Sequence, residues 1–279
     1  MKSELISIPT DSIPLDGLLY TIDNGNAASP PPAALLFHGN TMNFYTGSLK
    51  FLPPALAAIG IPSLAFNRRG HDILAIRNSR LAEGAAFQTA AQAIEDNRLA
   101  ARWLAQRGFS QQVVIGHSNG GMLAVQHVAN HPDTRALVLL SAHCGGKDMV
   151  PRASAAGLLA QDRVSEFTEK AKAMVAEGRG NELMLLPGWW YAISAESFLD
   201  QCENLPDVLA LASQIRCPVL YIRGDQEPRD LYPAELFAAR CPSACEVQIV
   251  KNCDHFYNGV EEEISSVVAT WLSKTLRLG

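Results

Sequence analysis

Short apolar runs recur along the chain and alternate with segments that have the periodicity of a helix. The runs are rich in Val, Ile, Leu and Ala, which is typical of strands that are buried on both faces. They lie at residues 33–37, 62–66, 113–115, 136–140 and 218–222, and a further strand is predicted at 246–250. Because this alternation of strands and helices requires crossover connections, it predicts a mainly parallel sheet with helices on both faces.

The helical segments are predicted at residues 49–59, 86–107, 122–130, 164–177 and 233–239, followed by a last helix near the end of the chain. Pro53-Pro54 interrupts the first of them. The last helix has one apolar face, formed by Ile264, Val267, Val268, Trp271 and Leu272.

The N-terminal residues follow a different pattern, with alternating polar and apolar positions at 4–8 and 18–22. We expect two half-buried strands that form an antiparallel hairpin at the edge of the sheet, with its turn at Asp16-Gly17.

The alternation breaks between residues 145 and 211, where no buried strand is predicted. The sequence therefore predicts a core domain formed by residues 1–144 and 212–279, with residues 145–211 inserted as a lid. The aromatic cluster Trp189-Trp190-Tyr191 lies in this insertion. It either lines an apolar substrate pocket or packs the lid on the core.

Composition narrows the choice of function. The chain has 279 residues, of which 48% are hydrophobic, and a formal net charge of -5 without a basic run. These features favour a small-molecule substrate and argue against nucleic acid and anionic membranes as partners.

No signal peptide, membrane-spanning run or paired C-x-x-C spacing is apparent, so we expect a soluble, cytoplasmic protein with free thiols and no metal. The oligomeric state, including a homodimer, stays open.

The most informative stretch is Gly116-His117-Ser118-Asn119-Gly120, which follows the strand at 113–115. Its G-x-S-x-G pattern is that of a nucleophile elbow, in which a serine lies on a tight turn between a strand and a helix. Glycines are needed there because the two backbones approach closely. Taken alone, the pattern also fits a glycine-rich helix start that is capped by a serine.

A nucleophilic serine needs a base, and the base needs a carboxylate that orients it. Both residue types follow later strands. Asp225 and Glu227 come after the strand at 218–222, and His255 comes after the strand at 246–250. The chain order of serine, acid and histidine is the order that accompanies the elbow motif.

Together these motifs resemble those of the α/β-hydrolase family, and they cover nearly the whole chain. The matching pieces are His38-Gly39-Asn40-Thr41, the elbow, residues 224–227 and Asp254-His255. The resemblance implies a twisted, mainly parallel sheet of eight strands, with a helical lid after the sixth. It also implies a serine nucleophile and no cofactor.

The resemblance further assigns roles to individual residues. The acid of similar enzymes stands three residues after the glycine of its turn, which favours Glu227 over Asp225, with Asp148 as a more remote alternative. The oxyanion hole would use the N–H of Asn119 and a second donor from Asn40 or Thr41. His143, which follows the sixth strand, would line the pocket.

These observations favour a serine hydrolase that cleaves an ester-like bond of a small organic substrate. Carboxylester hydrolysis comes first, ahead of thioester, amide, lactone or carbon–carbon cleavage. Two other functions stay open: a lyase that uses the same triad, and a ligand-binding protein that keeps the fold without catalysis.

Overall fold

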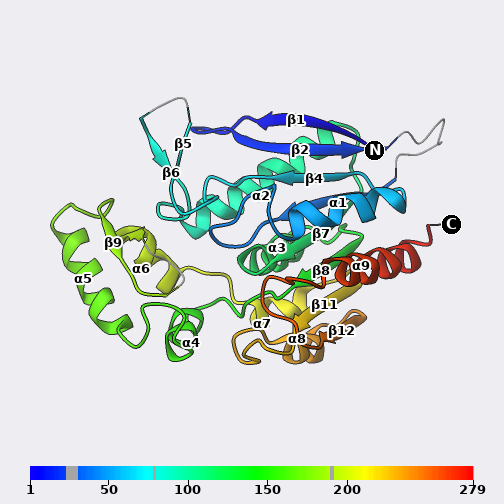
Figure 1. Ribbon diagram of the computed structural model, residues 1–279. Coiled ribbons are helices and arrows are strands. Elements are labelled where there is room, and N and C mark those ends of the chain that lie inside the picture. Colours follow the sequence, from blue (N-terminus) through cyan, green and yellow to red (C-terminus); the bar gives the residue numbers. More distant parts are fainter. Residues whose placement is uncertain (23–30, 78–79, 189–191, 279) are drawn as a thin grey trace.

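The computed structural model describes residues 1–22, 31–77, 80–188 and 192–278. Its centre is a twisted sheet of eight strands in the order β1-β2-β4-β3-β7-β8-β11-β12 (Figure 1). The strands are β1 (Lys2–Ile8), β2 (Leu15–Thr21), β3 (Ala33–Phe37), β4 (Ser63–Phe66), β7 (Gln112–His117), β8 (Ala136–Leu140), β11 (Val219–Gly224) and β12 (Cys245–Val250).

Along this order, all pairings from β4 to β12 are parallel, whereas the pairs β1–β2 and β2–β4 are antiparallel. The predicted mainly parallel sheet of eight strands is thus confirmed. The central strands β3 and β8 are buried at every position, as their continuous apolar sequences require.

The predicted position of the N-terminal turn was wrong. Asp16 and Gly17 lie inside β2, where they pair with Ser7 and Ile6. A side chain at Gly17 would place its Cβ 2.5 Å from the carbonyl oxygen of Ala65 in the neighbouring strand. The glycine therefore allows close approach of two strands, and the chain turns earlier, between Ile8 and Leu15.

Helices cover both faces of the sheet (Figure 1). One face carries α2 (Ala90–Gln106), α3 (Asn119–Ala129) and α8 (Ala234–Arg240), and the other carries α1 (Ser48–Ala58) and α9 (Glu261–Leu276). Thr89 and Gln92 form a capping box that begins α2. Helix α1 continues through Pro53 and Pro54, against the expected interruption, and buries Leu52 and Leu56 against the sheet.

Most of the chain between β8 and β11 forms a separate group of elements at one end of the molecule (Figure 1). This group contains α4 (Met149–Ala155), α5 (Val164–Ala176), β9 (Leu183–Leu185), β10 (Ala192–Ser194) and α6 (Ala195–Glu203). The helix α7 (Val208–Leu211) and the 3-10 turn Ala212–Gln214 follow, and they pack on the core of the sheet beside α8. Within the described parts of the chain, the strands β9 and β10 pair only with each other, so this segment contains a small hairpin that the sequence did not predict.

The segment between β8 and β11 has an apolar cluster around Phe167, Met174 and Phe198, to which Leu231 and Tyr232 from the chain after β11 also belong. Its two ends meet, because Gly145 and Asp207 form an isolated β-bridge. The segment also contacts residues 82–90, because the Ser194 N–H donates to the Ala86 carbonyl oxygen at 2.8 Å. These residues begin with the short strand β6 (Ala82–Glu83), which pairs with β5 (Ala75–Ile76).

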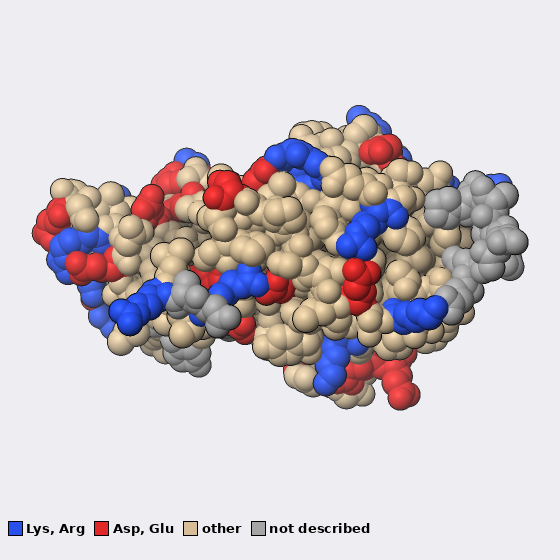
Figure 2. Space-filling view, turned by 90° about the horizontal axis from the view of Figure 1, so that it is seen from above, with Lys and Arg blue, Asp and Glu red and all other residues tan. Residues whose placement is uncertain are grey.

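Surface charges of both signs are intermixed on the described part of the face shown in Figure 2. None of the helices in the described residues combines the length and the apolar character that crossing a bilayer requires.

Candidate active site

Ser118 lies on a strained turn between β7 and α3. Its φ of 56° and ψ of -119° are unusual for a residue with a side chain. Gly116 and Gly120 make the turn possible, since a Cβ on Gly116 would lie 2.3 Å from the Gly120 carbonyl oxygen. The geometry is therefore that of the nucleophile elbow that the sequence predicted.

We expect Gly120→Ala to destabilise the protein strongly. The new Cβ would lie 2.2 Å from the Phe37 carbonyl oxygen and 2.5 Å from that of His38, and both contacts are with backbone rather than with flexible side chains. The unfolding free energy measured in urea should fall by about 3 kcal/mol, at the upper end of overpacking costs. Gly180→Ala is the matched control, because its Cβ would have ordinary contacts at 3.5 Å. Equal stabilities of the two variants would contradict this account.

Three side chains from the carboxyl ends of β7, β11 and β12 form a hydrogen-bonded chain. Ser118 Oγ lies 2.9 Å from His255 Nε2, and His255 Nδ1 lies 2.6 Å from Glu227 Oε1. Ser118 and Glu227 are buried and His255 is partly buried. The arrangement allows the imidazole to accept the Ser118 proton while the carboxylate stabilises the imidazolium.

Glu227 is held on its other side as well. Its Oε2 accepts hydrogen bonds from the Gly224 N–H at 2.8 Å and from Ser141 Oγ at 2.6 Å. Tyr257 Oη lies 2.6 Å from Ser141 Oγ, and burial raises the pKa of this tyrosine well above its ordinary value, so it stays protonated. Ser141 and Tyr257 were not singled out from the sequence. The sequence feature that could have indicated Ser141 is its position directly after the strand at 136–140.

The other candidate acids lie elsewhere. Asp225 is exposed, and its Oδ1 accepts from the Cys253 N–H at 3.2 Å rather than contacting His255. Asp148 is exposed and pairs with Arg152 at 2.9 Å.

Two further histidines lie close to the triad, and burial lowers the pKa of each to about 3, with the nearby His255 contributing. Both are therefore neutral near pH 7. His117 Nε2 donates to the His255 carbonyl oxygen at 2.8 Å and so holds the loop that carries the imidazole. His143 Nδ1 accepts from the Gly145 N–H at 3.1 Å, which leaves the proton on Nε2.

The loop after β3 lies beside the elbow. Asn40 and Thr41 share a cavity of about 110 Å³ with Ser118 and His255. Asn119 is the first residue of α3, so its N–H has no partner inside the helix. Asn119 and Asn40 also border a second, smaller cavity of about 20 Å³. The predicted oxyanion donors are thus brought next to the serine.

The cavity at Ser118 is otherwise mostly apolar. Met42, Met149 and Phe256 line it together with His143, and none of these three apolar residues was singled out from the sequence. Trp189, Trp190 and Tyr191, which were predicted to line a substrate pocket, lie outside the described residues.

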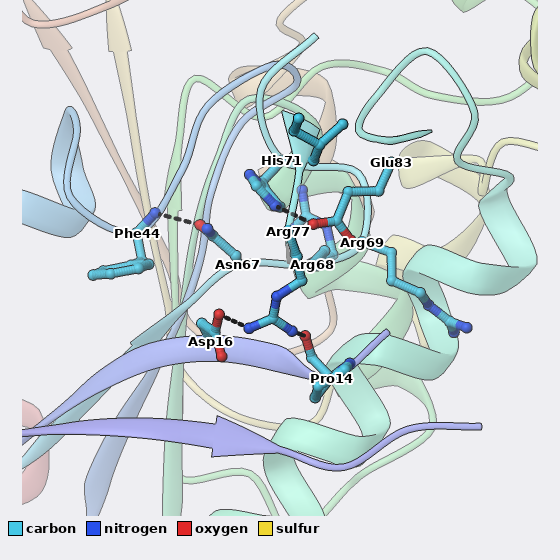
Figure 3. Close-up of a pocket in the computed structure, with 10 residues that line it drawn as sticks. Pro14, Asp16, Phe44, Asn67, Arg68, Arg69, His71, Arg77 and Glu83 are labelled. Atoms are coloured by element: carbon cyan, nitrogen blue, oxygen red, sulfur yellow. Dashed lines mark hydrogen bonds and ion pairs between the residues drawn. The ribbon is translucent and has the colours of Figure 1, made fainter. Parts of the chain in front are cut away.

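A larger cavity of about 470 Å³ lies next to residues 67–71, and neither Ser118 nor His255 lines it (Figure 3). Two pairs of its charged groups contact one another, and Arg68 and Arg69 also line it. Arg77 forms an ion pair with Asp16, and His71 Nε2 lies 3.4 Å from Glu83 Oε1 (Figure 3). The described residues contain no group of three or more His, Cys, Asp or Glu side chains that could hold a metal ion.

A parallel sheet in this strand order, with a serine elbow and a histidine at strand ends, defines an α/β protein of the hydrolase type. The family model described as "Alpha/beta hydrolase family" matches residues 34–266. The chain therefore belongs to the α/β-hydrolase family. The comparison with curated protein sequences gave no match.

Solved structures of low sequence identity share the fold over nearly their whole length. Est1E from Butyrivibrio proteoclasticus is 19% identical, with a TM-score of 0.68 and coverage of 98% of this chain and 99% of that chain. A carboxyl esterase from Bacillus coagulans is 14% identical, with a TM-score of 0.71 and 99% coverage of both chains. The hydrolase GrgF from Penicillium sp. sh18 is 15% identical, with a TM-score of 0.73 and coverage of 100% and 99%.

Proposed function

We propose that the protein is a serine hydrolase that cleaves carboxylic esters of small organic molecules. Family membership supports hydrolase activity at the coarse level. The observation that carries the finer proposal is the hydrogen-bonded chain from Ser118 through His255 to Glu227, with distances of 2.9 and 2.6 Å. The esterases among the structures of similar fold are consistent with it.

In this proposal Ser118 is the nucleophile. Its Oγ attacks the ester carbonyl carbon while His255 Nε2 takes its proton, and the carbonyl oxygen becomes an oxyanion. The N–H groups of Asn119 and Asn40 donate to that oxyanion. The intermediate collapses, His255 protonates the departing alkoxide, and the acyl group stays on Ser118. Water, deprotonated by His255, then releases the acid.

The cysteine thiols of the described residues are poorer candidates for the nucleophile than Ser118. Burial raises the pKa of Cys253 to about 12 and that of Cys144 to about 11, so both stay protonated at neutral pH. A protonated thiol is a poor nucleophile. Ser118 is therefore the group that we assign to the attack.

The apolar cavity supports a substrate with one short apolar arm. Met42, Met149 and Phe256 provide apolar walls beside Ser118 and His255. Met149 begins α4 of the inserted segment, so we propose residues 145–211 as a lid that contributes to specificity, on a core formed by residues 1–144 and 212–279.

Covalent labelling tests the proposal. A fluorophosphonate should add to the wild-type protein once, on the peptide that contains Ser118, as measured by mass spectrometry. Labelling should be lost in Ser118→Ala and in His255→Ala. A folded wild-type protein that is not labelled would instead favour a ligand-binding member of the family without catalysis.

A further inference from the structure

A buried arginine, Arg68, lies behind the two backbone segments that carry the proposed oxyanion donors. It follows β4 and is only 1% exposed. It belongs neither to the triad nor to the walls of the cavity at Ser118. A buried charge of this kind is costly unless polar or charged partners stabilise it.

The backbone of Arg68 sets the protonation of His38. The Arg68 N–H donates to His38 Nε2 at 3.1 Å, so the ring proton is on Nδ1. His38 Nδ1 in turn donates to the Gly39 carbonyl oxygen at 2.8 Å. Burial and the Arg68 charge both lower the pKa of His38 well below its ordinary value, so the ring stays neutral.

The Gly39 carbonyl belongs to the same peptide group as the Asn40 N–H. A peptide group is planar and this one is trans, so fixing the carbonyl also fixes the direction of the Asn40 N–H. The chain of bonds from Arg68 through His38 therefore orients one of the two proposed oxyanion donors.

The guanidinium of Arg68 connects the two segments. Its Nη2 donates to the His38 carbonyl oxygen at 2.7 Å and lies 3.5 Å from Asn119 Oδ1. Asn119 supplies the other proposed donor. One side chain therefore links the loop after β3 with the elbow.

The charge of Arg68 is poorly neutralised. Its Nε and Nη1 have no hydrogen-bond partner in the described part of the chain. Asp96 is the carboxylate that favours its charge, but Asp96 is paired with Arg69 at 2.7 Å. Burial lowers the pKa of Arg68 to about 10, which still leaves it charged at pH 7. A positive charge without a close counterion favours a negative charge that develops nearby.

We propose that Arg68 is a positioning residue for the oxyanion hole: it orients the Asn40 and Asn119 segments, and its charge stabilises the anionic tetrahedral intermediate. This inference rests on the serine hydrolase function proposed above. It adds a residue that touches no reacting atom and acts through His38, Asn119 and the local electric field.

The test compares Arg68→Lys, which keeps the charge, with Arg68→Gln, which removes it. Rates on p-nitrophenyl butyrate are divided by the concentration of sites that react with a fluorophosphonate. Arg68→Gln should lower kcat and kcat/KM together by about 10- to 100-fold, which is less than the loss of a direct oxyanion donor. Arg68→Lys should recover part of this loss.

The second measurement uses an aliphatic trifluoromethyl ketone. Ser118 Oγ adds to its carbonyl carbon, His255 takes the serine proton, and the carbonyl oxygen becomes the oxyanion of the adduct. The inhibition constant should rise in each variant by the factor by which kcat/KM falls, with KM changed less than about threefold. Arg98→Met is the control, because it removes a partly exposed guanidinium of α2 that pairs with Glu95 and leaves the Arg69–Asp96 pair in place. Its inhibition constant should equal that of the wild type.

The outcomes separate the two proposals. No fluorophosphonate reaction in the wild type overturns the proposed function itself. With that reaction present, an unchanged inhibition constant in both variants overturns the role of Arg68, as does equal activity of the Lys and Gln variants. If Arg68→Gln does not fold, a parallel loss of kcat/KM and ketone affinity in Arg68→Lys supports the role, and a loss of only one of them overturns it.

Discussion

Ser118→Ala should lower kcat for a p-nitrophenyl ester by about 10⁵- to 10⁶-fold, which is the scale of loss when a triad nucleophile is removed. The reason is that no other described group near His255 can form the acyl-enzyme. Stopped-flow kinetics should show a burst of p-nitrophenol in the wild type and no burst in the variant. The fold should be retained, because alanine adopts the Ser118 position with one atom fewer.

Ser63→Ala is the matched control for this experiment. Ser63 is also buried, and its Oγ has no hydrogen-bond partner in the described residues. It lies in β4 on the far side of β3 from the elbow strand. Its kcat should equal that of the wild type. Activity of Ser118→Ala above about one thousandth of the wild-type value would show that another group is the nucleophile.

The strands could be predicted well because they are buried on both faces. A strand such as β8 has only apolar residues, and its predicted limits agree with the structure. The edge strand β12, which is only partly buried, begins one residue earlier than predicted. The edge hairpin was harder to predict from the sequence. Asp16-Gly17 has the composition of a turn, but Gly17 lies within β2, where it allows β4 to approach closely. Nothing in the local sequence distinguishes these two uses of a glycine.

The candidate site could be predicted only in part. Ser118, Glu227 and His255 lie in recognisable turns at strand ends, and the structure brings them together. The role proposed for Arg68 could not be foreseen, because it rests on contacts with His38 and Asn119, which are 30 and 51 residues away in the chain. Contacts of this range arise from the strand order and leave no local pattern.

Glu227→Gln is expected to lower kcat by about 10³- to 10⁴-fold, and Asp225→Asn to change it less than twofold. The first value is the scale of effect when the triad acid becomes an amide, which holds the histidine in the wrong tautomer. The second follows because Asp225 is exposed and an asparagine can still accept from the Cys253 N–H. Steady-state kinetics on the same p-nitrophenyl ester measures both.

The direction of the effect follows from the surroundings of Glu227 Oε2. That oxygen accepts from Ser141 Oγ and the Gly224 N–H, so the carbonyl oxygen of a glutamine would take its place. The amide nitrogen would then face His255 Nδ1 and donate to it. The ring proton would move to Nε2, which could no longer accept the Ser118 proton.

This argument also predicts how the variant fails. The Glu227→Gln protein should bind substrate with nearly unchanged KM while acylation is slow, because the cavity at Ser118 does not include residue 227. A change in KM with unchanged kcat would mean that Glu227 shapes the site without orienting His255. A larger loss in Asp225→Asn than in Glu227→Gln would place the acid on the other carboxylate of the same turn, and the hydrogen bond between Glu227 and His255 would then have no part in catalysis.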